Sequence, residues 1–183
     1  MASEDLRRLV ERAQTGDRAA LEELYLLHFD RIYSYLHLSV GNRHDAEDLT
    51  NQTFVRMLES IGRFRWRRVP ISAWLFRIAH NLAMDHFRAG RRLQPEEKPP
   101  EHAGSEERSA EEEALHSLDR RSMLELIEQL SPDQQHVLVL KFVFDFPNRD
   151  VGTVLGKSEG AVKSLQHRAL ASLQRQLASA DPA

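Results

Sequence analysis

The sequence lacks several features that define common protein classes. Its 183 residues contain no cysteine, which excludes a disulfide framework, a thiolate metal site and a cysteine nucleophile. No apolar run approaches the roughly 18 residues that a membrane-spanning helix needs, and the charged, amphipathic N-terminus is unlike a secretory signal. We therefore expect a cytoplasmic protein that does not insert into a membrane.

Sequence signatures of catalysis are also missing. The nine histidines show no H-E-x-x-H or H-x-x-E-H spacing, so no zinc site of that kind is expected. The chain has neither a glycine loop for phosphate nor the G-x-S-x-G turn that carries a serine nucleophile. We expect no metal, no cofactor and no enzymatic activity.

The chain has little net charge as well. The formal sum of −3 argues by itself against a nucleic-acid partner, but the charges are segregated along the sequence. Residues 1–59 have a net charge of −4, residues 60–92 of +7 and residues 93–120 of −6, while the remaining residues balance. The total therefore hides a basic block beside an acidic one, and the basic block is compatible with DNA binding.

The acidic block coincides with a change in composition. Residues 93–113 contain three prolines, eight glutamates and one large apolar residue. Such a segment buries too little apolar surface to offset the entropy lost on ordering it. The composition predicts a flexible linker over residues 93–119, between one domain at 1–92 and a second at 120–177, with a short tail at 178–183.

The N-terminal domain is expected to be helical throughout. Asp17 can cap a helix whose apolar residues keep a helical period until Gly41. A second helix begins near Asp45 and ends at Gly62, and a third spans residues 72–89, closed by Gly90. The fold class predicted for both domains is all-α.

The basic block has the composition of a DNA-binding surface. One face of the third helix is apolar and the other is basic, and the preceding loop alternates arginine with Phe64 and Trp66. Arginines can hold phosphates, asparagine can pair with a base edge, and aromatic rings can stack on unpaired bases. For each aromatic residue, a role in the core is equally compatible with the pattern. The candidate residues are Arg63, Arg65, Trp66, Arg67, Arg68, Arg77, His80, Asn81, Arg88, Arg91 and Arg92.

The C-terminal domain has a helix-turn-helix pattern. Ser131–Gln134 combines a capping box with proline at the first helical position, and the following apolar helix to Phe144 should be the core. Asn148 can cap a short helix to Leu155, and Ser158 can cap a long helix to about Leu177. The first turns of such a helix meet base edges in the major groove. The candidate residues there are Ser158, Gly160, Lys163, Ser164, His167 and Arg168.

Four motifs together resemble the extracytoplasmic-function (ECF) group of bacterial sigma factors. They are D-A-E-D-L-T at residues 45–50, W-L-F-R-I-A-H-N at 74–81, D-x-x-R at 85–88 and S-E-G-A-V-K-S at 158–164. The resemblance implies a region 2 helical bundle that binds the β′ clamp of core RNA polymerase and reads and melts the minus-ten element. It also implies a region 4 helix-turn-helix domain that reads the minus-thirty-five element and touches the β flap.

The resemblance further assigns polymerase-binding residues to the second helix, namely Asp45, Glu47, Asp48, Leu49, Gln52 and Phe54. In this assignment the four polar residues meet the polymerase, while Leu49 and Phe54 pack. Without the resemblance, acidic residues at a helix start merely complement the helix dipole. The implied function is that of an alternative sigma factor, monomeric when free and controlled by an anti-sigma factor. One departure is Gly152, where most members carry alanine, which predicts a supporting helix weakened by up to about 1 kcal/mol.

Two alternatives stay open. A helix-turn-helix repressor or activator would bind operators without polymerase, but such proteins usually dimerise and neither domain shows a clear heptad seam. A sigma mimic that titrates an anti-sigma partner would need no basic DNA face, which residues 77–92 provide. We also hypothesise that the linker acids suppress DNA binding when core polymerase is absent.

Overall fold

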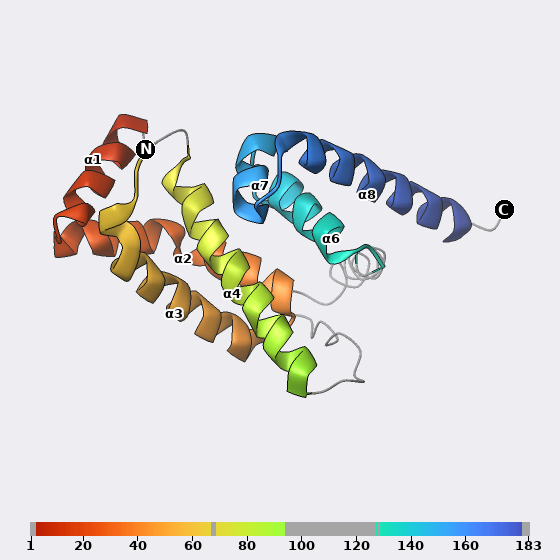
Figure 1. Ribbon diagram of the computed structural model, residues 1–183, viewed down its shortest axis with the longest axis horizontal. Coiled ribbons are helices and arrows are strands. Elements are labelled where there is room, and N and C mark those ends of the chain that lie inside the picture. Colours follow the sequence, from red (N-terminus) through yellow and green to blue (C-terminus); the bar gives the residue numbers. More distant parts are fainter. Residues whose placement is uncertain (1–2, 67–68, 94–126, 128, 181–183) are drawn as a thin grey trace, which may run out of the picture. The chain divides into compact units, whose positions relative to one another are not determined.

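The computed structural model describes residues 3–66, 69–93, 127 and 129–180. Within these residues all regular structure is helical and there are no strands, which confirms the all-α fold class. The described residues divide into two compact units, one that includes residues 3–66 and 69–93 and another that includes most of residues 127–180 (Figure 1). The predicted linker, residues 93–119, lies outside the described residues except for Leu93.

The N-terminal unit is a bundle in which α2 occupies the central position. Its helices are α1 (Ser3–Gln14), α2 (Arg18–Val40), α3 (Arg43–Ser60) and α4 (Ile71–Leu93), with a 3-10 turn η1 (Ile61–Arg63) after α3. Helix α2 packs against α1, α3 and α4 (Figure 1). The largest fully buried side chains of this core include Tyr35 of α2 and Phe76 of α4.

Local capping explains where the first helices begin and end. The Asp17 carboxylate accepts a hydrogen bond from the Ala20 N–H at 3.2 Å, and Gly41 ends α2 in the left-handed conformation with φ of 68°. Both predicted ends of α2 are confirmed. Helix α3 begins two residues before the predicted start, because the Asn42 side chain caps it by accepting from the Asp45 N–H at 3.2 Å.

The predicted end of the third helix at Gly90 is wrong, because α4 continues to Leu93. A glycine lowers helix stability by about 1 kcal/mol but does not by itself end a helix when the next residues favour helix. Arg91 and Arg92 are such residues, so the basic segment stays helical to the end of the region.

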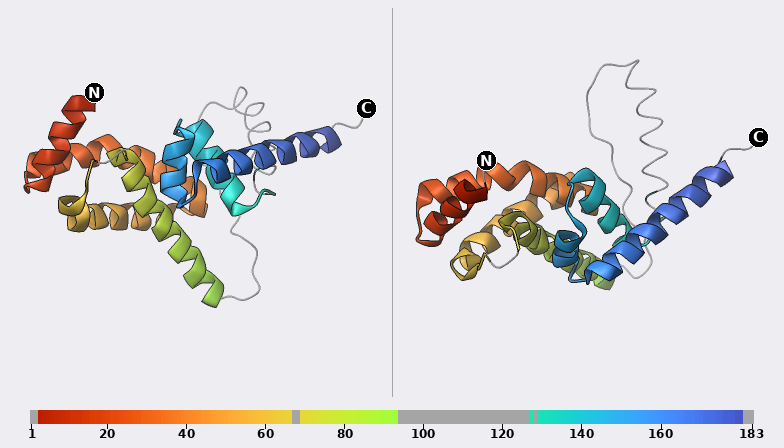
Figure 2. Two further views of the ribbon diagram at one scale, coloured as in Figure 1. Left: turned by 45° about the horizontal axis from the view of Figure 1, so that its top comes forward. Right: turned by 90° about the horizontal axis from the view of Figure 1, so that it is seen from above.

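The C-terminal unit consists of α6 (Pro132–Leu138), the π-helical turn η2 (Val139–Val143), α7 (Asn148–Leu155) and α8 (Glu159–Ala180). The Ser131 N–H donates to the Gln134 side chain at 3.0 Å, which confirms the capping box. Leu130 and Leu138 pack with Ala169 of α8, and Leu173 covers this cluster. Beyond these contacts the C-terminal end of α8 extends past α6 and α7 (Figure 2).

The π turn changes which residues reach the core. The apolar helix to Phe144 was predicted to form the core, yet Phe142 is 60% exposed and Val143 is 61% exposed. In η2 the Phe144 N–H donates to the Val139 carbonyl, five residues back, so the turn holds one residue more than an α-helical turn. The register therefore shifts, and Phe144 becomes the buried residue.

The helix-turn-helix pattern is confirmed with one correction. Asn148 is the first residue of α7 and not its cap, since the Pro147 carbonyl accepts from the N–H groups of Asp150 and Val151 at 2.8 and 3.0 Å. The Ser158 hydroxyl caps α8 by accepting from the Ala161 N–H at 3.2 Å, as predicted.

Gly152 has a packing role that the sequence analysis missed. A Cβ atom at this position would lie 2.6 Å from the backbone carbonyl oxygen of Lys157, and the Lys157 N–H donates to the Gly152 carbonyl at 2.9 Å. Both groups belong to the backbone, so neither the Lys157 carbonyl nor the Gly152 backbone can shift to make room for a Cβ atom without a cost in free energy. Gly152 lets α7 approach the turn before α8 closely.

Candidate nucleic-acid and polymerase interfaces

The basic loop after η1 combines one buried and one half-buried aromatic ring. Phe64 is buried, with its ring centroid 5.1 Å from that of Trp74 and 6.0 Å from that of Trp66. Trp66 is half-buried and stands edge-on to Phe64. These aromatic residues could either pack in the core or stack on unpaired bases. Phe64 packs in the core, whereas the exposed part of Trp66 can contact a ligand.

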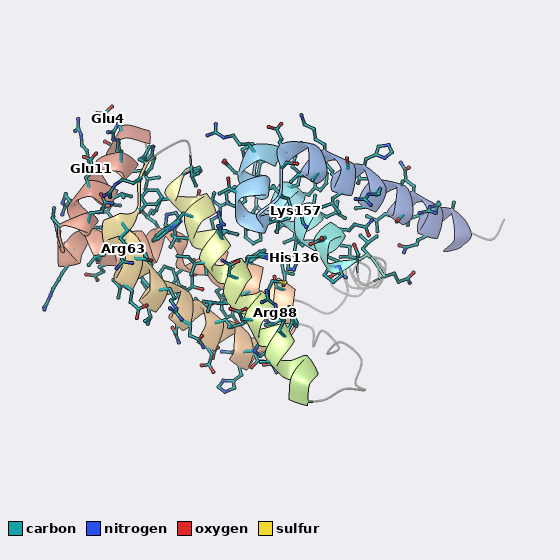
Figure 3. The ribbon with its side chains drawn as sticks, viewed as in Figure 1. Glu4, Glu11, Arg63, Arg88, His136 and Lys157 are labelled. Atoms are coloured by element: carbon teal, nitrogen blue, oxygen red, sulfur yellow. The ribbon has the colours of Figure 1, made fainter. Side chains whose placement is uncertain are left out.

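The arginines of this loop are presented to solvent where the structure describes them. Arg63 and Arg65 are exposed, and the Arg65 guanidinium donates to the carbonyl of Phe64 at 3.2 Å. Figure 3 labels Arg63 at the end of η1 and Arg88 on α4 of the same unit. Arg67 and Arg68 lie outside the described residues.

Helix α4 presents an exposed polar face of three predicted residues. Arg77, Asn81 and Arg88 are four and seven residues apart and all exposed, so they share one side of the helix. Arg88 forms an ion pair at 3.2 Å with Asp85, three residues earlier on the same helix. Arg91 and Arg92 continue the helix, but only their backbone is described.

His80 does not belong to this face, contrary to prediction. It is 8% exposed, and its Nδ1 lies 2.9 Å from the Tyr35 hydroxyl of α2. Tyr35 is fully buried, and burial raises the pKa of its hydroxyl well above the usual range. The pair is therefore a polar contact inside the core that satisfies two buried groups, and we remove His80 from the DNA-contact candidates.

The first turns of α8 gather the residues predicted for the helix-turn-helix. Lys163, Ser164, His167 and Arg168 line one shallow hollow of about 350 Å³. The Lys163 ammonium forms an ion pair with Glu159 at 3.0 Å, one turn earlier. Ser158 serves as the helix cap, and Gly160 has open space around it.

The polymerase-binding candidates on α3 divide into core and surface residues. Leu49 and Phe54 are buried, and the Phe54 ring lies 4.7 Å from that of Tyr25 on α2. The expectation that these two residues pack is confirmed, and the contact of Phe54 with Tyr25 joins α3 to α2. Asp48 and Gln52 are exposed.

Two other acidic candidates are engaged within the chain. Asp45 lies 3.5 Å from His86 of α4, and Glu47 pairs with Arg43 at 2.9 Å. Among the described residues the charged partner of Asp48 is more distant, with the His44 Nε2 at 3.9 Å. Val55 and Leu58 of α3 are each 53% exposed, which the sequence did not predict, because an apolar residue on a helix is ordinarily assigned to the core.

Comparison with known proteins places both units in one family. Sigma-70 region 2 matches residues 24–93, and Sigma-70 region 4 matches residues 120–173. The ECF RNA polymerase sigma factor SigD of Mycobacterium tuberculosis is 31% identical over 186 residues, which cover 98% of this chain and 87% of SigD. The chain belongs to the ECF sigma factors.

Two other similar proteins add to this ECF comparison. The ECF RNA polymerase sigma factor BldN of Streptomyces coelicolor is 41% identical over 170 residues, and the chain spans 64% of its length. The sigma factor RpoE, solved in complex with the anti-sigma factor NepR from Bartonella quintana, has the same fold with a TM-score of 0.71 and 21% identity. That comparison covers 85% of this chain and 95% of RpoE.

Among the described residues no group of three or more metal-ligating side chains is placed to hold a metal ion. Every helix in the described part of this ECF sigma factor is too short or too polar to span a bilayer. The region 2 match includes α3, η1 and α4, and the region 4 match includes α6, α7 and most of α8.

Proposed function

We propose that the chain is an alternative sigma factor that binds core RNA polymerase and directs initiation at specific promoters. The observation that carries the proposal is the order of the two family matches, region 2 followed by region 4, each with an exposed basic face on one helix. We keep the proposed boundaries, with region 2 in residues 1–92, the linker in 93–119, region 4 in 120–177 and a tail in 178–183.

Region 2 would read and melt the minus-ten element with the α4 face and the loop before it. Arg77 and Arg88 can hold phosphates, and Asn81 lies between them where it can meet a base edge. In the described part of the chain no carboxylate pairs with Arg77, so its charge is available to DNA. Trp66 offers a ring on which an unpaired base can stack. The remaining arginines of the predicted set, Arg63, Arg65, Arg67, Arg68, Arg91 and Arg92, would add phosphate contacts.

Region 4 would read the minus-thirty-five element with the start of α8. Lys163, His167 and Arg168 share one hollow with Ser164, at the end of the helix that enters the major groove in this motif. Ser158 and Gly160 sit at the first turn, where the backbone can approach a phosphate. Lys163 must leave Glu159 to contact DNA, which makes its contribution to affinity smaller than that of an unpaired lysine.

Core polymerase would bind the outer face of α3. Asp48, Gln52 and Val55 are exposed at spacings of four and three residues, and this face also includes Leu58. Acidic and apolar side chains together suit a protein partner better than DNA, which would repel the acid. The β flap would contact region 4, and the exposed Phe142 and Val143 offer an apolar surface there.

Binding through both units explains how modest contacts can become selective. Once one unit is bound, the other acts at a high effective concentration, so two weak contacts add to a strong one. A partner of the anti-sigma class is proposed as well, since RpoE has this fold and was solved with the anti-sigma factor NepR. Such regulation is compatible with a protein that works in the cytoplasm as a monomer.

Run-off transcription with core polymerase on fragmented genomic DNA tests the function. Specific transcripts that require the chain would support a sigma factor. DNA binding without initiation would instead support a repressor or activator, and neither binding nor initiation would support a sigma mimic. The Arg77→Ala variant should lose most of the initiation, whereas Arg18→Ala, which changes another exposed arginine at the start of α2, should keep it.

A further inference from the structure

Helix α1 lies outside the region 2 match, which begins at residue 24. Nevertheless α1 contacts η1, the turn that leads into the basic loop (Figure 1). The contact includes a specific polar link. The Nε2 of Gln14, the last residue of α1, donates to the carbonyls of Ile61 at 2.9 Å and Phe64 at 2.8 Å.

The two acceptors lie at the two ends of η1. The Phe64 N–H donates to the Ile61 carbonyl at 3.0 Å, so one backbone bond closes the turn and the Gln14 amide spans it from outside. Ile61 and Phe64 are buried and Gln14 is half-buried, so few water molecules are available to donate hydrogen bonds to these carbonyls in its place. Each carbonyl has one other donor, the Phe64 N–H for Ile61 and the Arg65 guanidinium for Phe64, so the Gln14 amide contributes the net free energy of two hydrogen bonds. The Gln14 amide therefore holds the start of the basic loop in one conformation.

The same residues border a hollow on the surface of the unit. It has a volume of about 250 Å³, and α1 supplies one wall while the loop supplies the other. The α1 side is formed by Arg7, Val10, Glu11 and Gln14, and the loop side by Phe64, Arg65 and Trp66. Arg7 is paired with Glu11 at 3.0 Å, so among the described lining residues Arg65 is the cation without a carboxylate partner, and it lines the hollow together with Trp66. A nucleotide fits this lining, because its planar base can stack on Trp66 while its phosphate meets Arg65.

We propose that Gln14 is a positioning residue for recognition of the minus-ten element. By holding the carbonyls of Ile61 and Phe64, it keeps Arg65 and Trp66 in place to receive an unpaired promoter base, and α1 thereby becomes part of the recognition unit. In this assignment Gln14 itself contacts neither polymerase nor the promoter DNA. The proposal rests on the proposed function.

The test uses the full chain assembled with core polymerase. Gln14→Met keeps the length of the side chain and removes both donated hydrogen bonds. Gln174→Met makes the same replacement at an exposed glutamine of α8 and serves as the matched control. Melting is followed with a fluorescent adenine analogue at a minus-ten base, and binding is followed separately on a fragment that carries only the upstream element.

We expect Gln14→Met to lower the equilibrium constant for melting by about 10-fold, which corresponds to about 1.4 kcal/mol, because the variant loses both hydrogen bonds that hold the loop. It should also reduce discrimination against a substituted minus-ten base, while upstream binding stays unchanged. A purely structural defect would lower both activities together and leave base discrimination intact, which would overturn the proposal. Wild-type-like melting and discrimination in Gln14→Met would overturn it as well.

A second pair of variants covers the case in which Gln14→Met does not fold. Gln14→Lys keeps N–H donors that can reach the two carbonyls, whereas Gln14→Glu has the same length and offers none when ionised. We expect melting to survive in the lysine variant and to fail in the glutamate variant, and equal melting in both would refute the positioning role. If the wild-type holoenzyme melts no promoter, the proposed function itself fails.

Discussion

His28 of α2 makes the stability of the N-terminal unit depend on pH. The ring is 7% exposed, and neither nitrogen has a hydrogen-bond partner among the described residues. Burial, with a smaller contribution from the charge of Arg31, lowers the pKa of His28 from 6.5 to about 4. The folded state therefore favours the neutral ring, and between these two pH values the unfolded chain binds the additional proton.

The sign and size of the effect follow from this difference. Because the folded pKa is lowered, the contribution of His28 is fully present above pH 6.5 and is lost as the pH falls toward 4. At about 1.4 kcal/mol for each unit of pKa, the whole loss is about 3 kcal/mol, of which about 2 kcal/mol falls between pH 7 and pH 5. That is a large share of the 5–15 kcal/mol by which domains are typically stable.

Urea unfolding followed by helical circular dichroism measures this loss. Replacing His28 by leucine, which has no group to titrate, should reduce the fall in unfolding free energy between pH 7 and pH 5 by about 2 kcal/mol. Near neutral pH the variant should be at least as stable as the wild type, because it buries no unpartnered polar atom. His167→Leu, an exposed position on α8, is the control. An equal fall in wild type and His28→Leu would refute the reasoning.

Three further predictions concern the two interfaces and the turn between α7 and α8. Gly152→Val should lower the unfolding free energy of the C-terminal unit by about 1–3 kcal/mol in a thermal melt, because its Cβ would lie 2.6 Å from the Lys157 carbonyl; an unchanged melting temperature would contradict the packing role. Asp48→Arg should abolish co-purification with core polymerase without loss of helicity, and retained binding would exclude α3 as the contact. Lys163→Ala should weaken upstream-element binding and reduce the salt slope by about one counterion, and an unchanged slope would place recognition elsewhere on α8.

Local patterns predicted most of the helical fold. The ends of α2 follow from Asp17 and Gly41, and the start of α8 follows from Ser158, because a cap acts within a few residues of itself. The π turn of η2 has no comparable local signal. It is visible only in the structure, where it leaves Phe142 exposed and buries Phe144.

Surface residues could be predicted from the sequence where the helical period places them on one exposed face. Arg77, Asn81 and Arg88 share the exposed side of α4, as do the predicted residues at the start of α8. His80 was wrongly placed on the exposed face because it lies at the edge of that face. At such a position a contact with another helix determines whether the side chain is buried, and here that contact is with Tyr35 of α2. Gln14 was missed for the same reason, since its two acceptors are 47 and 50 residues away in the sequence.

Mapping the 5′ ends of transcripts tests the central claim most directly. Core polymerase is supplied with genomic DNA, once alone and once with the purified chain, and the start sites of the two reactions are compared. We expect the chain to create new start sites that share two upstream sequence elements at a fixed spacing, one for each unit. Identical start sites with and without the chain would contradict its assignment as a promoter-selecting sigma factor.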